Sequence, residues 1–301
     1  MSHDHKHLVA NKSSNSILVA FFLNASFAII EFVGSYYTNS IAIQSDALHD
    51  FGDSLALLFS YFAEKFSLKE SDEKFTHGYR RFSLLAGFVN GVILLGGSIY
   101  VLIDSIQRLQ HPEAVYAPGM IGLAIVGIIV NSYAALRLNK NSGLNSKMIS
   151  LHLLEDVLSW VAVLIVSIIL MFRPWFILDS ILSIMISLLI LKGVYKNLMS
   201  IGSIFLQKFP DGLVIKDIRN EIMKLPHVED VHLIKGWAID ESKFNISLHV
   251  RVNLDTSIAQ LDLLRRKVEE YLEKKDVLEL TIQFEGSDCS YSAKTIGAVH
   301  D

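Results

Sequence analysis

The sequence predicts a membrane protein with an all-α bundle of six transmembrane helices, followed by a C-terminal α+β domain. Hydrophobic residues make up 51% of the 301 residues, and the mean hydropathy of +0.39 is higher than in most soluble domains. The apolar residues are concentrated before about residue 208, in stretches of the roughly 20 residues that a helix needs to cross a bilayer. The rest alternates helical and strand-like patterns, as a soluble domain does.

The predicted transmembrane domain covers residues 16–208 and follows a polar N-terminal segment, residues 1–15. Backbone polar groups inside a bilayer must be hydrogen-bonded within the protein, so each span is expected to be a helix. Charged residues interrupt the apolar stretches of the second and fifth spans. The spans are expected at 16–37, 41–63, 82–103, 117–138, 148–172 and 175–195.

Basic residues predict the orientation of the bundle. Lys and Arg gather in the loops between spans 2 and 3 and between spans 4 and 5, whereas the loop between spans 1 and 2 has none. Short loops rich in Lys and Arg stay in the cytoplasm. Both termini are therefore expected to be cytoplasmic.

Residues 209–301 are expected to form a compact cytoplasmic domain with the element order αββαβ. Helical periodicity runs over 214–225 and 261–272, and alternating patterns predict strands at 231–239, 244–252 and 278–284. Cys289 is the single cysteine, so it cannot form an internal disulfide.

Two of the predicted spans carry the same motif, a histidine followed four residues later by an aspartate. Span 2 has His49 and Asp53, and span 5 has His152 and Asp156. Residues four apart lie on one helix face, one turn apart, and ionisable groups at bilayer depth normally face a partner or a wet cavity. Two such faces together offer two imidazoles and two carboxylates, which suit tetrahedral Zn²⁺. We therefore predict a His2Asp2 metal site inside the bundle.

The type of ligand predicts how such a site would work. Metal binding requires neutral histidine and ionised aspartate, so binding releases protons and proton uptake releases metal. The ligand type thus predicts a secondary transporter that exchanges Zn²⁺ for protons, and the predicted topology favours export from the cytoplasm as its direction. Cd²⁺, Co²⁺ and Fe²⁺ accept similar ligands and are not distinguished by them.

Other readings of the motif stay open. The same side chains could join helices by hydrogen bonds, carry protons without metal, or serve a membrane-embedded metal sensor without flux. An intramembrane metalloenzyme is disfavoured, because four protein ligands leave no open position and no His-Glu-x-x-His pattern occurs. A net charge of -4 gives no reason to expect nucleic acid as a partner.

Further charged residues accompany the motif. Asp50 and Glu155 lie one residue off the two pairs and are expected to point elsewhere or toward a water-filled mouth, and Asp46 could line a vestibule. Glu31 and Asp179 lie inside other spans, where a charged residue is functional by default.

The six spans, the paired motifs in spans 2 and 5 and the αββαβ tail together resemble the cation diffusion facilitators. The resemblance covers about residues 16–289, and the motifs are similar to those of zinc-type members. It implies that the membrane site is the transport site and that the tail is a ferredoxin-like, metallochaperone-like domain that forms a homodimer. The expected location is the inner membrane of a bacterium.

Three weaker metal sites are expected outside the bundle. Similar tails suggest a regulatory zinc site at His232, His249 and Glu285, and some relatives bind a second metal in the loop that here holds Asp72 and His77. The N-terminal histidine tract within residues 3–7 could deliver metal. Each has a plain alternative, namely solvated strand histidines, a structural loop and an unstructured tract.

Overall fold

A computed structural model describes residues 3–67, 71–139 and 144–286. The described side chains do not include those of residues 3–17 and 144–153, nor a few others at helix ends. The chain divides into two compact units, one of residues 1–69 and 85–199 and the other of residues 70–84 and 200–301.

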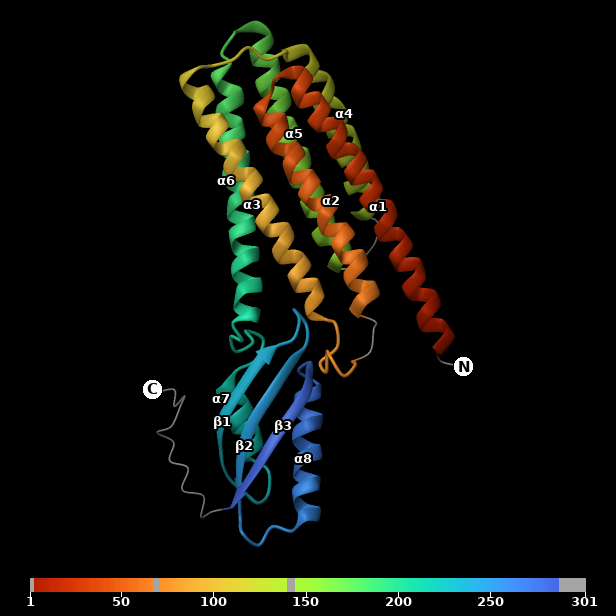
Figure 1. Cartoon of the computed structure of the whole chain (residues 1–301), viewed down its shortest axis with the longest axis vertical. Helices are drawn as coiled ribbons and strands as arrows, with labels where there is room; N and C mark the ends of the chain where they lie inside the picture. The colour runs from red at the N-terminus through yellow and green to blue at the C-terminus, as the bar shows by residue number, and fades with distance from the viewer. Residues whose placement is uncertain (1–2, 68–70, 140–143, 287–301) are drawn as a thin grey trace. The chain divides into compact units, whose positions relative to one another are not determined.

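Six long helices run alongside one another in the first part of the chain (Figure 1). Several helices extend beyond the predicted apolar spans, because polar residues can form the same backbone hydrogen bonds and continue a helix. The bounds are α1 (His3–Thr38), α2 (Ile41–Ser67), α3 (Arg81–Gln110), α4 (Ala117–Asn139), α5 (Leu144–Phe172) and α6 (Ile177–Phe205).

Four of these helices contain a described stretch that is long and apolar enough to cross a membrane. The stretches are Ala20–Thr38, Arg81–Gln110, Leu154–Phe172 and Ile177–Phe205. The described apolar stretch of α4 is Ala117–Tyr133, and α2 is interrupted by the acidic residues of its motif. The described residues thus contain a helical transmembrane domain, while the number of six spans stays a prediction.

The core of the bundle is formed by buried side chains of α2, α3, α4, α5 and α6, and Phe27 of α1 packs against it. Trp160 of α5 is 1% exposed and meets Phe27 of α1 edge-on, with ring centroids 6.2 Å apart. Gly127 of α4 permits this packing, since a Cβ atom there would lie 2.4 Å from the indole ring.

Buried serine side chains join α6 to its neighbours. The hydroxyl of Ser187 lies 3.0 Å from that of Ser45 in α2. One turn away, Ser183 lies 2.8 Å from the hydroxyl of Ser105 in α3 and donates to the carbonyl oxygen of Ile41 at 3.1 Å. Hydroxyl groups thus satisfy each other inside the bundle, as expected for helices that pack within a membrane.

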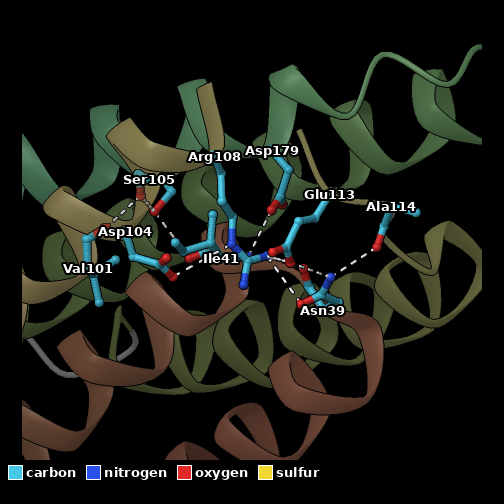
Figure 2. Close-up of polar contacts among 10 residues, drawn as sticks. Asn39, Ile41, Val101, Asp104, Ser105, Arg108, Glu113, Ala114 and Asp179 are labelled. Carbon is cyan, nitrogen blue, oxygen red and sulfur yellow. Dashed lines mark hydrogen bonds and ion pairs between the residues drawn. The ribbon is translucent and has the colours of Figure 1, made fainter. Parts of the chain in front are cut away.

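A polar cluster ties the turns at one end of the bundle together (Figure 2). Arg108 of α3 donates to the backbone and side-chain oxygens of Asn39 at 3.0 and 3.2 Å, and its guanidinium lies 3.4 Å from Glu113. Asp179, at the start of α6, accepts hydrogen bonds from the Ser40 hydroxyl at 2.6 Å and the Ile41 N–H at 2.8 Å. Asp179 therefore satisfies backbone N–H groups at the start of α2, which is a structural role.

The second part of the chain has the predicted order αββαβ (Figure 1). Its three strands form one sheet in the order β1-β2-β3, with β1 and β2 antiparallel and β2 and β3 parallel. The parallel pair is possible because a helix crosses over between its strands. The bounds are α7 (Ile215–Met223), β1 (Val228–Ala238), β2 (Phe244–Val252), α8 (Ile258–Glu273) and β3 (Val277–Gly286).

Both helices of this domain share one core with one face of the sheet. Ile218 of α7 and Val268 of α8 are buried with Ile246, Leu248 and Val250 of β2. Because side chains alternate along a strand, the odd-numbered residues of β2 lie on the other face of the sheet, away from the helices.

Candidate metal sites

The face of α2 that carries the motif presents four acidic or imidazole side chains within two turns. Asp46, His49, Asp50 and Asp53 follow one another at spacings of three, one and three residues, which keeps them on one side of the helix. Gly52 lies between Asp50 and Asp53 in the sequence. It lets Leu94 of α3 approach α2 closely, since a Cβ atom at Gly52 would lie 2.2 Å from the leucine side chain. The α3 side of α2 is thus packed, and the acidic side faces α1 and α5.

His49 brings together two of the three other predicted ligands. Its Nε2 atom lies 3.9 Å from Oδ2 of Asp53, one turn along α2, and 3.9 Å from Oδ1 of Asp156 in α5. The side chains of His49 and Asp53 are about a quarter exposed, at 26% and 29%, whereas that of Asp156 is 11% exposed. His49 and Asp53 are therefore accessible from outside the bundle, whereas Asp156 is largely enclosed by it.

The separations suit atoms arranged around a cation better than they suit direct hydrogen bonds. Two ligands at about 2.1 Å from a tetrahedral Zn²⁺ are about 3.4 Å apart. Each of the two distances from Nε2 of His49 would have to shorten by roughly half an ångström to reach that spacing. Among the described residues, His49, Asp53 and Asp156 do not yet bring one ligand atom each within 4.8 Å of the others. Such a movement lies within the freedom of side-chain rotation.

The fourth predicted ligand, His152, lies one turn before Asp156 in α5, but its side chain is outside the described residues. The backbone alone puts it on the same helix face as Asp156. The complete set of four ligands therefore stays a prediction.

Ser159 is a residue of this region that the sequence did not single out. Its hydroxyl donates a hydrogen bond of 2.8 Å to Oδ1 of Asp46, so α5 contacts α2 through a second polar pair. Ser159 lies three residues after Asp156 and so on the same face of α5, which is the feature of the sequence that could have indicated it.

The tail brings its three predicted ligands together on the sheet. His232 in β1 is paired directly with His249 in β2, and their ring centroids are 5.6 Å apart. Glu285 in β3 joins them, with Oε1 2.5 Å from Nδ1 of His249 and Oε2 3.2 Å from Nε2 of His232. One ligand atom from each residue lies within 4.8 Å of the others. Two imidazoles and a carboxylate at this spacing fit a zinc ion with a further ligand from water or a partner.

A second carboxylate lies beside His232. Oδ2 of Asp230 lies 3.3 Å from Nδ1 of His232 and Oε2 of Glu285 lies 3.2 Å from its Nε2, although neither contact has the geometry of a hydrogen bond. Burial by itself would raise the pKa of Asp230, but the hydrogen bond and the charge of Arg219 outweigh it and hold that pKa below its usual range. An ionised carboxylate on the far nitrogen is the arrangement that metal-binding histidines commonly have.

The predicted loop ligands are used differently in the structure. Asp72 accepts hydrogen bonds from the backbone N–H groups of Lys74 and Phe75 and from the hydroxyl of Tyr79, at 2.6–3.0 Å. Nδ1 of His77 lies 3.1 Å from Oε2 of Glu279 in β3. Within the described ranges, Asp72 and His77 belong to no group of three candidate ligands. The loop site stays a prediction, and the observed contacts are structural.

Comparison with known proteins identifies the family. Residues 17–206 match the model of the cation efflux transmembrane domain, and residues 210–287 match that of the cation efflux protein cytoplasmic domain. The chain belongs to the cation diffusion facilitator family. Its members are transporters, so the chain is an integral membrane transporter and not an enzyme.

Individual members of the cation diffusion facilitator family resemble the chain over nearly its whole length. The zinc transporter ZitB of Escherichia coli (strain K12) is 30% identical, over 99% of this chain and 97% of the relative. The metal cation efflux system protein CzcD of Cupriavidus metallidurans is 33% identical, over 95% and 90%. A cadmium, cobalt and zinc/H(+)-K(+) antiporter of Bacillus subtilis (strain 168) is 30% identical, over 95% and 92%.

Proposed function

We propose that this chain is a secondary transporter that exports Zn²⁺ from the cytoplasm in exchange for protons, through His49, Asp53, His152 and Asp156. The observation that carries the proposal is the approach of His49 to Asp53 on the same helix and to Asp156 on α5, at 3.9 Å each. The names of the relatives support zinc as substrate, with cadmium and cobalt as further candidates, and Fe²⁺ is a candidate by ligand type.

Proton exchange follows from the donor set. A histidine must lose its proton and an aspartate must be ionised before either can hold the metal. A proton that enters from the side of release therefore competes directly with Zn²⁺ for the same atoms. The name of the Bacillus subtilis relative, an antiporter, supports this coupling.

The proposed arrangement in the membrane has six spans within residues 16–208, with residues 1–15 and 209–301 in the cytoplasm and the lipid bilayer of the bacterial inner membrane around the bundle. Basic residues in the loops between spans 2 and 3 and between spans 4 and 5 support this orientation. We infer further that the tail binds Zn²⁺ at His232, His249 and Glu285 as a regulatory ligand and that the chain works as a homodimer. The close approach of the three side chains supports the tail site.

The deciding measurement is zinc flux into sealed proteoliposomes under an imposed proton gradient. The native chain is expected to accumulate zinc, and Asp156→Ala is expected to reduce the rate to that of empty vesicles, because it removes a ligand of the proposed site. Glu155→Ala is the matched control, since Glu155 is the preceding residue of α5 and is exposed. It is expected to keep most of the native rate.

The outcomes separate the proposal from its alternative. Equal accumulation by the native chain and Asp156→Ala would show that the site assignment is wrong. Zinc binding with no flux in any chain would favour the membrane-embedded sensor, for which the tail cluster would be the reporting element.

A further inference from the structure

The turn between α1 and α2 is fastened to other parts of the bundle at the end that the proposed orientation places outside the cytoplasm. Arg108 of α3 donates hydrogen bonds to the backbone and side-chain oxygens of Asn39 at 3.0 and 3.2 Å. Asp179 of α6 accepts hydrogen bonds from the Ser40 hydroxyl and the Ile41 N–H at 2.6 and 2.8 Å. The turn therefore joins α3 and α6, which are far apart in the sequence (Figure 2).

The connection between α3 and α4 is also fastened to this turn. The side-chain amide of Asn39 donates to Oε2 of Glu113 at 3.0 Å, and the guanidinium of Arg108 lies 3.4 Å from the same carboxylate. The backbone N–H of Tyr116 donates to the carbonyl oxygen of Thr38 at 2.8 Å. Two polar side chains and one backbone hydrogen bond thus hold the turn against the connection.

Arg108 makes contacts with more than one of these parts. Its side chain is only 18% exposed, and its guanidinium lies 3.6 Å from Asp104, one turn earlier on α3. Charge-assisted hydrogen bonds away from bulk water are stronger than neutral ones. Asn39, which accepts two of them, has a φ of 53°, a left-handed conformation in which asparagine is one of the few residues besides glycine to occur. The shape of the turn and the contacts of Arg108 therefore support each other.

Small hydroxyl side chains lie in the bundle between this turn and the proposed transport site. His49 lies eight residues after the first residue of α2, or about 12 Å along the helix. Over this length the hydroxyl of Ser45 lies 3.0 Å from that of Ser187, and Ser105 lies 2.8 Å from Ser183. All four serines are at most 1% exposed. An ion that left the site in this direction would meet polar oxygens, and the fastened turn would be the last obstacle.

We propose that Asn39, Arg108, Glu113 and Asp179 form an outer latch, which closes this end of the bundle and must open for the ion to leave. The inference rests on the proposed transport function and adds the step of release to it. A transporter exposes its site to one side of the membrane at a time, so contacts that close one end have to break once in each cycle. The contacts of Arg108 suit this role, because side-chain hydrogen bonds can be lost without unfolding a helix.

The test measures how fast a cysteine below the outer latch reacts with a membrane-impermeant methanethiosulfonate that carries a quaternary ammonium group. Cys289→Ser removes the single native cysteine, and Ser45→Cys places one at a buried position between the latch and the site. In right-side-out vesicles, Arg108→Gln in this full chain is expected to raise the rate at least about tenfold, because the rate follows the fraction of molecules open on the outer side. In inside-out vesicles the rate is not expected to rise.

Arg173→Gln is the matched control, because Arg173 is an exposed arginine at the same end of the bundle, in the connection between α5 and α6. It is expected to leave both rates unchanged. Glu113→Ala changes a latch side chain that is 55% exposed and is expected to raise the outer rate by a smaller factor than Arg108→Gln. Glu113→Ala decides the question if Arg108→Gln does not fold.

Two results would overturn the outer latch. An unchanged rate for Arg108→Gln in right-side-out vesicles would show that these contacts do not close the outer end. A rise in inside-out vesicles as well would show that Arg108 only stabilises the fold. Neither rate requires zinc to move, so failure of this inference is distinguishable from failure of the transport function, which absence of zinc flux in the native chain would show.

Discussion

At the scale of single residues, Asp240 shows how a turn carboxylate is held ionised. Oδ1 accepts hydrogen bonds from the N–H groups of Ser242 and Lys243, both at 2.8 Å, and Oδ2 lies 3.2 Å from Nη1 of Arg80. Burial alone would raise the pKa of Asp240, but these hydrogen bonds outweigh it and hold the pKa below its usual range. The turn between β1 and β2 is therefore stabilised by the ionised form.

This direction gives a pH dependence. The stabilisation is complete above the unfolded pKa of about 4 and is lost as the pH falls through the lower pKa of the folded state, because the unfolded chain then binds more protons. Asp240→Asn is expected to lower the melting temperature equally at pH 8 and pH 6, with a smaller difference below about pH 4. Thermal melts in detergent measure this. Glu241→Gln, an exposed neighbour, is the control.

Residues of the membrane site could be predicted to different degrees. The contact of His49 with Asp53 follows from helical spacing alone. The approach of Asp156 could be expected from the repeated motif, but its distance depends on how α2 and α5 pack. Ser159 could not be predicted as a partner of Asp46, since serines occur in many of the predicted spans and only packing decides which one meets a carboxylate.

At the scale of elements, the contact between α4 and α5 depends on the absence of a side chain. Gly127→Ala would place a Cβ atom 2.4 Å from the ring of Trp160, which is 1% exposed and has no room to move. We expect a loss of about 1–3 kcal/mol in the free energy of unfolding, as for other overpacked cores. Gly122→Ala on the same helix meets nothing within 4 Å and is expected to be neutral. Equal thermal melts for the two variants would contradict this account.

The strands of the tail give a second prediction. A zinc ion at His232, His249 and Glu285 would join all three strands. At a zinc concentration a hundredfold above Kd, binding should raise the free energy of unfolding by about 2.7 kcal/mol, and the melting temperature of the chain should rise with it. His249→Ala is expected to remove this effect, whereas His227→Ala, which changes an exposed histidine of the same domain, should keep it. All chains would carry Asp156→Ala to exclude the membrane site. An unchanged zinc effect in His249→Ala would disprove the tail site.

The type of an element, helix or strand, could be predicted more accurately than the residues at which it begins and ends. Both strand patterns of the predicted hairpin appear at nearly the expected residues, since alternation is a direct record of a half-buried sheet. The irregular pairing between His232 and Lys235 could not be foreseen, because a bulge leaves no fixed sequence pattern. The predicted sixth span ended at 195, whereas α6 continues to Phe205, because hydropathy reports the lipid-facing length and not the helix.

At the scale of the whole molecule, the orientation in the membrane can be tested with the native cysteine. Cys289 is the only cysteine, and it lies in the tail, outside the described residues. A membrane-impermeant maleimide is expected to label it in inside-out vesicles but not in right-side-out vesicles. Detergent should permit labelling in both. Labelling in intact right-side-out vesicles would place the tail outside the cytoplasm and reverse the proposed direction of transport.

The serine contacts of α6 have a mechanical consequence. Ser183 and Ser187 occupy successive turns, and each finds a hydroxyl or carbonyl partner on α2 or α3. If α6 slid by one turn, about 5.4 Å, Ser183 would reach Ser45 and Ser180 would take its former place. The same helix also buries Leu182, Ile186, Ile190 and Val194 in the core of the bundle. A slide of α6 would therefore exchange hydroxyl partners readily but would have to repack these aliphatic side chains, so the core and not the serines holds the helix in place.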